Sequence, residues 1–111
     1  MKVIKNGAGV EYEAKGHVRC HAMNKLVVGQ DTRRVTVGMS HFLPAGGAEM
    51  SASPKERTYF VIAGKIKITG KNEEHLLEPG DLIYIAPKEE RAFKVQGNEP
   101  ATILVTIVDV E

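Results

Sequence analysis

Short stretches of alternating polar and apolar residues recur along the chain. Lys65 to Thr69 alternates strictly, which is the period of a half-buried strand, and the β-branched and aromatic run before it ends on Gly64. This pattern predicts a strand, a glycine turn and a second strand. By the same criteria we expect strands over residues 2–4, 10–13, 17–26, 35–43, 57–63, 65–69, 75–77, 82–86, 91–95 and 101–110.

Turn-forming residues separate these expected strands. Pro44 to Gly47, Asn72 to Glu74 and Gly97 to Pro100 are rich in the residues that turns prefer. No segment carries an apolar stripe with the 3.6-residue period of a helix. Many short strands with closely spaced turns therefore predict an all-β sandwich or barrel.

The stretch from Val35 to Leu43 predicts a direction for one histidine. Its odd positions are apolar except for His41, whereas its even positions include threonine, glycine and serine. Because neighbouring strand residues face opposite ways, we expect His41 to point toward the core. An imidazole exchanges a proton near physiological pH, so His41 is a candidate general acid or base. The alternative is a core histidine held by one hydrogen bond.

Composition narrows the classes of partner. The chain has 111 residues, which suits one domain, and its net charge is +1, so we expect neither a nucleic-acid partner nor a membrane surface. No apolar run approaches the roughly 20 residues that span a bilayer, and Met1 to Asn6 does not resemble a secretory signal. Cys20 is the single cysteine, which agrees with a cytoplasmic location and predicts an inert thiol.

Two segments resemble the two conserved motifs of the cupin family. Gly64 falls on the closing glycine of the first motif, and Gly80 falls on the opening glycine of the second. The resemblance spans roughly residues 35–108 and implies a double-stranded β-helix, or jelly-roll, barrel. It implies one cupin domain over 1–111, with 1–34 as an N-terminal arm and 35–111 as the barrel core. Because small cupins commonly pair this arm with a second subunit, we expect a homodimer.

The resemblance also implies where a ligand would bind. The family's four metal-ligand positions correspond to Ser51, Ser53, Arg57 and Arg91, which should converge inside one end of the barrel. A hydroxyl is a weak metal ligand and a guanidinium offers no lone pair. We therefore expect no metal and no other cofactor at this position.

Two arginines inside a barrel require compensation, because an unpaired buried charge costs several kcal/mol. Glu49, Arg57 and Tyr59 are all odd-numbered, so in alternating strands they are expected on the same face. Glu49 is therefore expected either to pair with an arginine or to move a proton together with His41. Tyr59 would form a wall of the site. The other source of compensation is the carboxylate or phosphate of a ligand, which an arginine binds through two parallel hydrogen bonds.

Two other arrangements stay open at this point. Arg57 and Arg91 could lie at the rim and pair with acidic neighbours, namely Glu56, Glu89 and Glu90. His17 and His21 share one face of their strand, with Cys20 on the other, and could bind a metal if His41 or His75 completed the set. His17 is also a candidate ligand-binding residue, because the arm could bring it to the barrel mouth.

These observations favour one function and leave two alternatives. We expect the barrel to bind a small anionic or polyoxygenated metabolite and to catalyse a non-redox isomerase, cyclase or lyase step. The first alternative is a non-catalytic binding or regulatory module. The second is a metalloenzyme with atypical histidine ligands.

Overall fold

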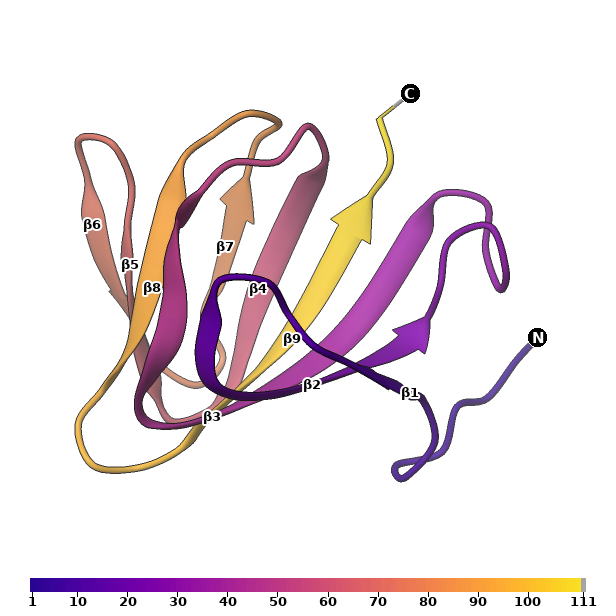
Figure 1. The fold of residues 1–111 in the computed structure, drawn as a ribbon, viewed down its shortest axis with the longest axis horizontal. Coiled ribbons are helices and arrows are strands. Elements are labelled where there is room, and N and C mark those ends of the chain that lie inside the picture. Colours follow the sequence, from indigo (N-terminus) through magenta and orange to yellow (C-terminus); the bar gives the residue numbers. More distant parts are fainter. Residues whose placement is uncertain (111) are drawn as a thin grey trace.

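The computed structural model describes residues 1–110 and is built from strands (Figure 1). No helix within this range is long and apolar enough to cross a membrane. The strands are β1 (Val10–Tyr12), β2 (His17–Leu26), β3 (Val35–Ser51), β4 (Glu56–Ala63), β5 (Lys65–Thr69), β6 (Glu74–Leu77), β7 (Leu82–Ile85), β8 (Arg91–Gln96) and β9 (Ala101–Val108). The expected all-β architecture is confirmed.

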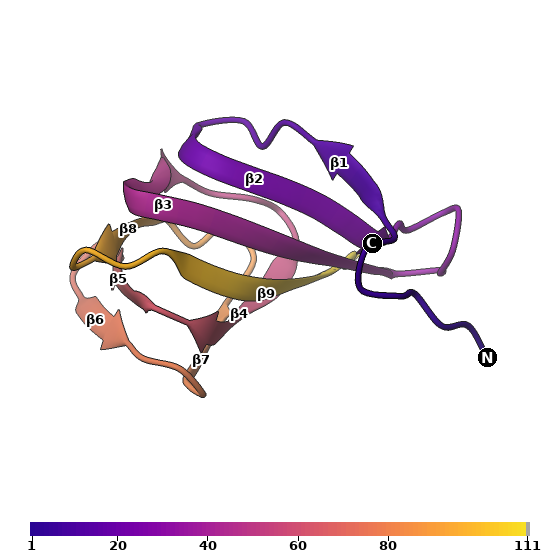
Figure 2. The ribbon, with the colours of Figure 1, turned by 90° about the horizontal axis from the view of Figure 1, so that it is seen from below.

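The strands form one sheet that rolls up into a nearly closed barrel. They are hydrogen-bonded in the order β6-β5-β8-β3-β9-β4-β7, and β2 adds to β3 with β1 beyond it. Figure 2 shows the sheet curled so that its two end strands, β6 and β7, lie on the same side of the molecule. The side chains at these two edges surround a cavity, which is described with the site below.

Strand β3 links the two halves of the barrel. Its first part pairs with β9 from Val35 to Phe42, and its second part pairs with β8 from Gly47 to Ser51. The turn expected at Pro44 to Gly47 is therefore wrong, because the chain bends there without leaving the sheet. A Cβ atom on Gly47 would lie 2.1 Å from the carbonyl oxygen of Phe93, so glycine permits the close pairing with β8.

The core lies inside the barrel, where alternate residues of each strand meet. Strand β5 has the polar outer face and the apolar inner face that the sequence predicts. The most deeply buried large side chains are Phe42, Ile66, Ile103 and Val61. Aromatic rings connect the two halves, because Phe93 packs edge-on against Phe42 at 5.1 Å and against Tyr59 at 5.5 Å between ring centroids.

The N-terminal segment runs along the outside of the barrel. Strand β1 pairs with β2 of the same chain, and the Nζ of Lys25 donates to the carbonyl oxygens of Lys5, Asn6 and Ala8. The strand expected over residues 2–4 is wrong, because the backbone there pairs with no neighbouring strand.

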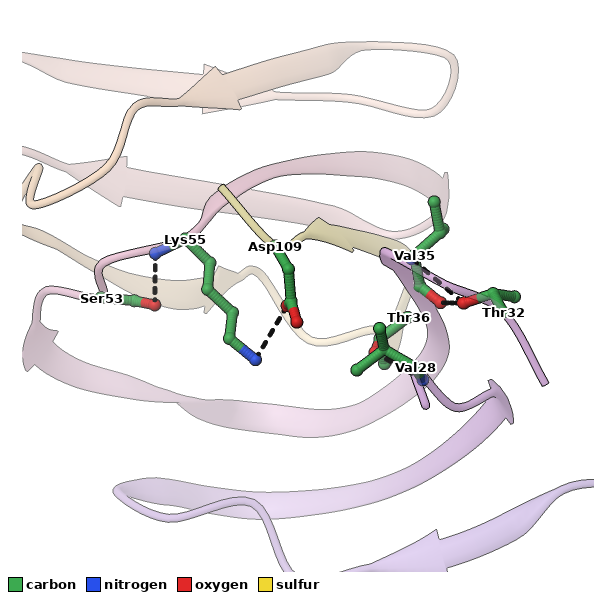
Figure 3. A network of polar contacts seen from close by, with 7 residues as sticks. All are labelled: Val28, Thr32, Val35, Thr36, Ser53, Lys55 and Asp109. Carbon is green, nitrogen blue, oxygen red and sulfur yellow. Dashed lines mark hydrogen bonds and ion pairs between the residues drawn. The ribbon is translucent and has the colours of Figure 1, made fainter. Parts of the chain in front are cut away.

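Polar contacts fasten the connection between β3 and β4 (Figure 3). The Oγ of Ser53 accepts a hydrogen bond from the backbone N–H of Lys55 at 3.2 Å. The Nζ of Lys55 lies 3.1 Å from Oδ1 of Asp109, an ion pair whose geometry is not that of an aligned hydrogen bond. At the start of β3, the Oγ1 of Thr32 accepts a hydrogen bond from the backbone N–H of Val35, and the Oγ1 of Thr36 accepts one from the backbone N–H of Val28. The loop that leads from Ser51 into Arg57 is thus held to the end of β9.

Candidate functional site

Arg91 is a buried cation at the start of β8. It shares the inward face of that strand with Phe93 and Val95, and only 9% of its surface is exposed. Its Nε donates to the hydroxyl of Tyr59 at 3.3 Å, and its Nη1 donates to the carbonyl oxygen of Ser51 at 2.9 Å and to the Ser51 hydroxyl at 3.3 Å. Three different strands therefore position this guanidinium.

All of these partners are neutral. Within residues 1–110 no carboxylate forms an ion pair with Arg91 or Arg57. The alternative in which the two arginines pair with neighbouring glutamates at the rim is therefore not what the structure adopts. The Nη2 of Arg91 makes no hydrogen bond to this part of the chain, which leaves a donor for a ligand.

Arg57 adds a second positive charge on the interior face. It precedes Tyr59 by two residues on β4, so the two side chains point the same way. Its Nε is buried and has no hydrogen-bond partner in the described chain. A buried donor without a partner is unusual in proteins and indicates a place where a ligand or water would be held.

A cavity of about 290 Å³ opens between the two edges of the rolled sheet. Its volume lies near the lower end of the range for small-molecule sites. Arg91 forms part of its wall, together with apolar residues from β5, β6 and β7 and acidic residues from the adjoining loops. The lining residues are Ile68, Gly70, Glu73, His75, Leu77, Leu82, Ile83, Tyr84, Ile85, Glu89, Glu90 and Arg91.

Ser53 takes part in a loop rather than in the Arg91 contacts. Besides its hydroxyl bond to Lys55, its carbonyl oxygen accepts from the backbone N–H of Lys88 at 2.6 Å. These contacts tie the β3–β4 loop to the β7–β8 loop that leads into Arg91. The role of Ser53 in the structure is thus to support the site from outside.

His41 points away from the barrel interior, and its expected direction is wrong. The buried positions of β3 are the even ones, including Ser40 and Phe42, whereas the side chain of His41 is exposed. Its Nδ1 lies 3.1 Å from the hydroxyl of Thr102. The alternation failed here because the outward face, with Met39 and Leu43, is the more apolar one, whereas the inward face carries glycine and serine beside Phe42.

Glu49 also lies outside the barrel. The pairing of β3 with β8 shifts register between Ala48 and Ser51, which is a β-bulge, and the bulge places both of these residues inward. Glu49 is exposed, and its carboxylate approaches Gly16 in the arm. The predicted pairing of Glu49 with an arginine is therefore absent from residues 1–110.

His17 lies among the core aromatic rings. Its ring stacks on Phe42 at 6.0 Å and meets Phe93 edge-on at 5.9 Å between centroids. Its Nδ1 is 2.9 Å from the carbonyl oxygen of Lys15, which can only accept, so Nδ1 carries the hydrogen. His17 thus belongs to the ring cluster that supports Tyr59 and not to the lining of the cavity.

Two features near the site were missed by sequence reasoning. Tyr12 of the arm pairs with the buried Ala22 and is itself 41% exposed. Partial burial raises the pKa of its phenol, with a further rise from Cys20 and Tyr59 and a lowering from Arg57. Glu73 and His75 line the cavity beside Arg91. The sequence does place His75 two residues before the buried Leu77, so the two share a face of their strand.

Burial raises the pKa of the Cys20 thiol. The thiol therefore stays protonated, which agrees with an inert residue.

The side chains gathered at Arg91 do not fit a metal ion. Hydroxyls are weak ligands and guanidiniums have no lone pair to donate. Among residues 1–110 there is no group of three or more histidine, cysteine, aspartate or glutamate side chains that could hold a metal. His21 and His41 stack on the outer face with their ring centroids 6.1 Å apart, whereas the half-buried His17 packs on Phe42 and His75 lines the cavity.

Comparisons with known proteins agree on one family. The model of the cupin domain matches residues 38–107. The chain is 28% identical over 110 residues to Beta-D-galactosidase Rv1717 of Mycobacterium tuberculosis, covering 96% of this chain and 93% of the relative. Among solved structures, the polyketide cyclase RemF from Streptomyces resistomycificus superposes with a TM-score of 0.84 at 15% identity, covering 97% of this chain and 79% of that one. An RmlC-like cupin from Shewanella frigidimarina gives 0.78 at 10% identity, covering 97% and 91%. The chain therefore belongs to the cupin family and has its double-stranded β-helix fold.

Proposed function

We propose that this cupin binds a small anionic or polyoxygenated metabolite at the barrel mouth and catalyses a non-redox isomerase, cyclase or lyase step on it without a metal. The observation that carries the proposal is Arg91, a buried cation that touches only neutral acceptors and lines a cavity. Such a charge is costly when unpaired, and a ligand carboxylate or phosphate would neutralise it.

The residues around Arg91 have distinct roles in this proposal. Arg91 binds the acidic group of the ligand through Nη2, while Tyr59 and Ser51 hold the other guanidinium nitrogens in place. Arg57 does not line the cavity, and it adds positive charge from the interior face of β4. Apolar residues of β5, β6 and β7, among them Ile68, Leu77 and Ile85, would contact the rest of the ligand.

Removal of the positive charge at Arg91 tests the proposed binding of an anion. We expect at least one compound in a panel of sugar acids, 2-oxo acids and sugar phosphates to raise the melting temperature of the protein. Arg91→Gln should then weaken binding of that compound by about 30-fold or more, because a buried charge pair is worth 2–5 kcal/mol. Titration calorimetry measures the Kd, and circular dichroism checks that the variant is folded.

Lys94→Gln is the control, since it removes the same charge from the exposed face of the same strand. Binding should be unchanged in this variant. Arg91→Lys keeps the charge but loses the planar fork, and we expect an intermediate loss. A panel that stabilises nothing, or equal binding by wild type and a folded Arg91→Gln protein, would contradict the proposal.

Glycoside hydrolysis is a second candidate function. It is favoured by the similarity to a protein named a β-D-galactosidase over nearly its whole length and by three glutamates around the cavity, Glu73, Glu89 and Glu90. Glycosidases use a pair of carboxyl groups flanking the scissile bond. Glu89 accepts from the backbone N–H of Ala86 at 2.9 Å, and Glu73 lies 2.7 Å from Nε2 of His75. Within residues 1–110 the carboxylate of Glu90 has no such partner, so Glu90 is the first candidate for one member of the pair.

A chromogenic substrate tests this second candidate. We expect purified protein to release nitrophenol from a nitrophenyl β-D-galactoside, and Glu90→Gln to lower kcat by about 100-fold or more. Glu78→Gln is the control, since Glu78 pairs with Lys65 and lies outside the cavity lining. Hydrolysis no faster than in a mock preparation, or equal in all variants, would reject glycosidase activity.

We propose further that the protein works in the cytoplasm as a homodimer. The single cysteine supports a reducing compartment. Within residues 1–110, strand β1 pairs with β2 alone, so its other edge is open to a strand of a second copy.

A further inference from the structure

His75 and Glu73 form a pair at the barrel mouth. The Nε2 of His75 lies 2.7 Å from Oε1 of Glu73. In the pairing of β5 with β6, His75 is opposite Ile68, which is buried inside the barrel. Side chains that face each other across two strands lie on the same side of the sheet, so His75 is on the inward side of β6. Both members of the pair line the cavity that contains Arg91.

The contact with Glu73 decides which nitrogen of His75 can act as a base. A carboxylate accepts hydrogen bonds only, so in the neutral ring the hydrogen is on Nε2 and the lone pair is on Nδ1. A carboxylate on the far nitrogen also stabilises the imidazolium that forms when Nδ1 takes a proton. This is the arrangement of an oriented general base.

The cavity thus places a proton acceptor and an anion-binding group in one space. We propose that His75, oriented by Glu73, is the general base of this site, and that the substrate is a small 2-oxo acid whose carboxylate binds Arg91. The inference rests on the proposed function and deepens it, since it names the class of substrate and the residue that moves the proton. It gives to His75 and Glu73 the role that the sequence suggested for His41 and Glu49.

The step is balanced without any co-reactant. Nδ1 of His75 takes a proton from the carbon next to the carbonyl group, and the C–H electron pair becomes the double bond of an enolate. The charge on the enolate oxygen is stabilised by the positive potential of Arg91. Return of the proton to the same carbon restores the substrate. Where that carbon carries a hydroxyl group, as in hydroxypyruvate, the hydroxyl proton moves to the other oxygen of the enediolate, and return of the proton from the imidazolium to the former carbonyl carbon completes an isomerisation to the hydroxy aldehyde.

Solvent exchange detects this step even when the natural product is unknown. The protein is incubated in D₂O with 2-oxobutyrate, hydroxypyruvate or 2-oxoglutarate, and proton NMR follows loss of the signal from the carbon next to the carbonyl. We expect wild-type protein to accelerate exchange in a probe that it binds. His75→Gln should slow that exchange by about 100-fold or more, because general base catalysis contributes at least this factor. Glu73→Gln should slow it by a smaller factor, and Kd should be unchanged in both variants.

The chain offers a matched control on its outer surface. His21 and Glu11 form a similar exposed pair, with Nε2 and Oε1 3.4 Å apart, and neither residue lines the cavity beside Arg91. His21→Gln and Glu11→Gln should leave binding and exchange unchanged. Binding without exchange, or undiminished exchange in His75→Gln, overturns this inference but leaves the proposed function intact. Absence of binding by every probe contradicts the proposed function itself, and the inference then fails with it.

Discussion

Phe42→Ala is expected to lower the free energy of unfolding by about 3–5 kcal/mol, the range for a fully buried aromatic residue replaced by alanine. The side chain of Phe42 is 1% exposed and its ring packs edge-on against Phe93. Alanine would leave a cavity among residues from several strands, and such a cavity collapses only in part because hydrogen bonds between neighbouring strands hold the surrounding backbone in place. Urea unfolding followed by circular dichroism measures the loss.

Phe60→Ala provides the matched control for this substitution. Phe60 lies on the outward side of β4 and is 36% exposed, so the same atoms are deleted without opening an internal cavity. We expect a loss of about 1 kcal/mol or less. Equal losses in the two variants would mean that Phe42 does not occupy a closed core.

The effect of Phe42 on the site runs through neighbouring rings. Phe42 packs against Phe93, Phe93 packs against Tyr59, and the hydroxyl of Tyr59 accepts from Nε of Arg91. The apolar core therefore fixes the orientation of the guanidinium. A buried charge that is pre-oriented in this way binds an anion without a further cost of ordering the side chain.

The sequence predicted the barrel strands well where the two faces of a strand differ. Strand β5 alternates Lys65, Lys67 and Thr69 with Ile66 and Ile68, and the two isoleucines are the buried residues. In β8 the alternation likewise places Arg91 on the same face as the core residues. The resemblance to the second cupin motif had implied this inward position for Arg91, and the register of β8 explains it, because one residue of register decides the face of every side chain in the strand.

Prediction failed where the outward face of a strand is the more apolar one and where the register shifts. In β3 the hydrophobic pattern gave His41 the wrong direction, and Glu49 changed face because of the bulge between Ala48 and Ser51. Neither event has a local signal. A bulge is set by how two strands fit together over their length, and that fit depends on residues far away in the chain.

The cavity was beyond the reach of sequence reasoning for a different reason. It forms where the edges of β6 and β7 approach each other, and these strands lie at opposite ends of the hydrogen-bonded order. Strand periodicity tells which face His75 is on, but the curvature of the whole sheet decides what lies across from it. Sheet curvature is the sum of the twist of many strand pairs, so no single motif reports it.

Gly64→Ala is expected to lower the free energy of unfolding by about 2–5 kcal/mol, combining left-handed backbone strain with overpacking. Gly64 joins β4 to β5 at φ +76°, and a Cβ atom there would lie 2.3 Å from the carbonyl oxygen of Pro100 and 2.7 Å from Cα of Ala101. Both atoms are backbone, so the clash can be relieved only by moving a strand end.

Gly80→Ala separates the backbone strain from the overpacking, because Gly80 has φ +92° but a Cβ there meets nothing within 4 Å. It should cost about 1–2 kcal/mol from the backbone strain alone. If urea unfolding gave the same loss for both variants, contact with the start of β9 would not be the reason that this turn of the barrel requires glycine.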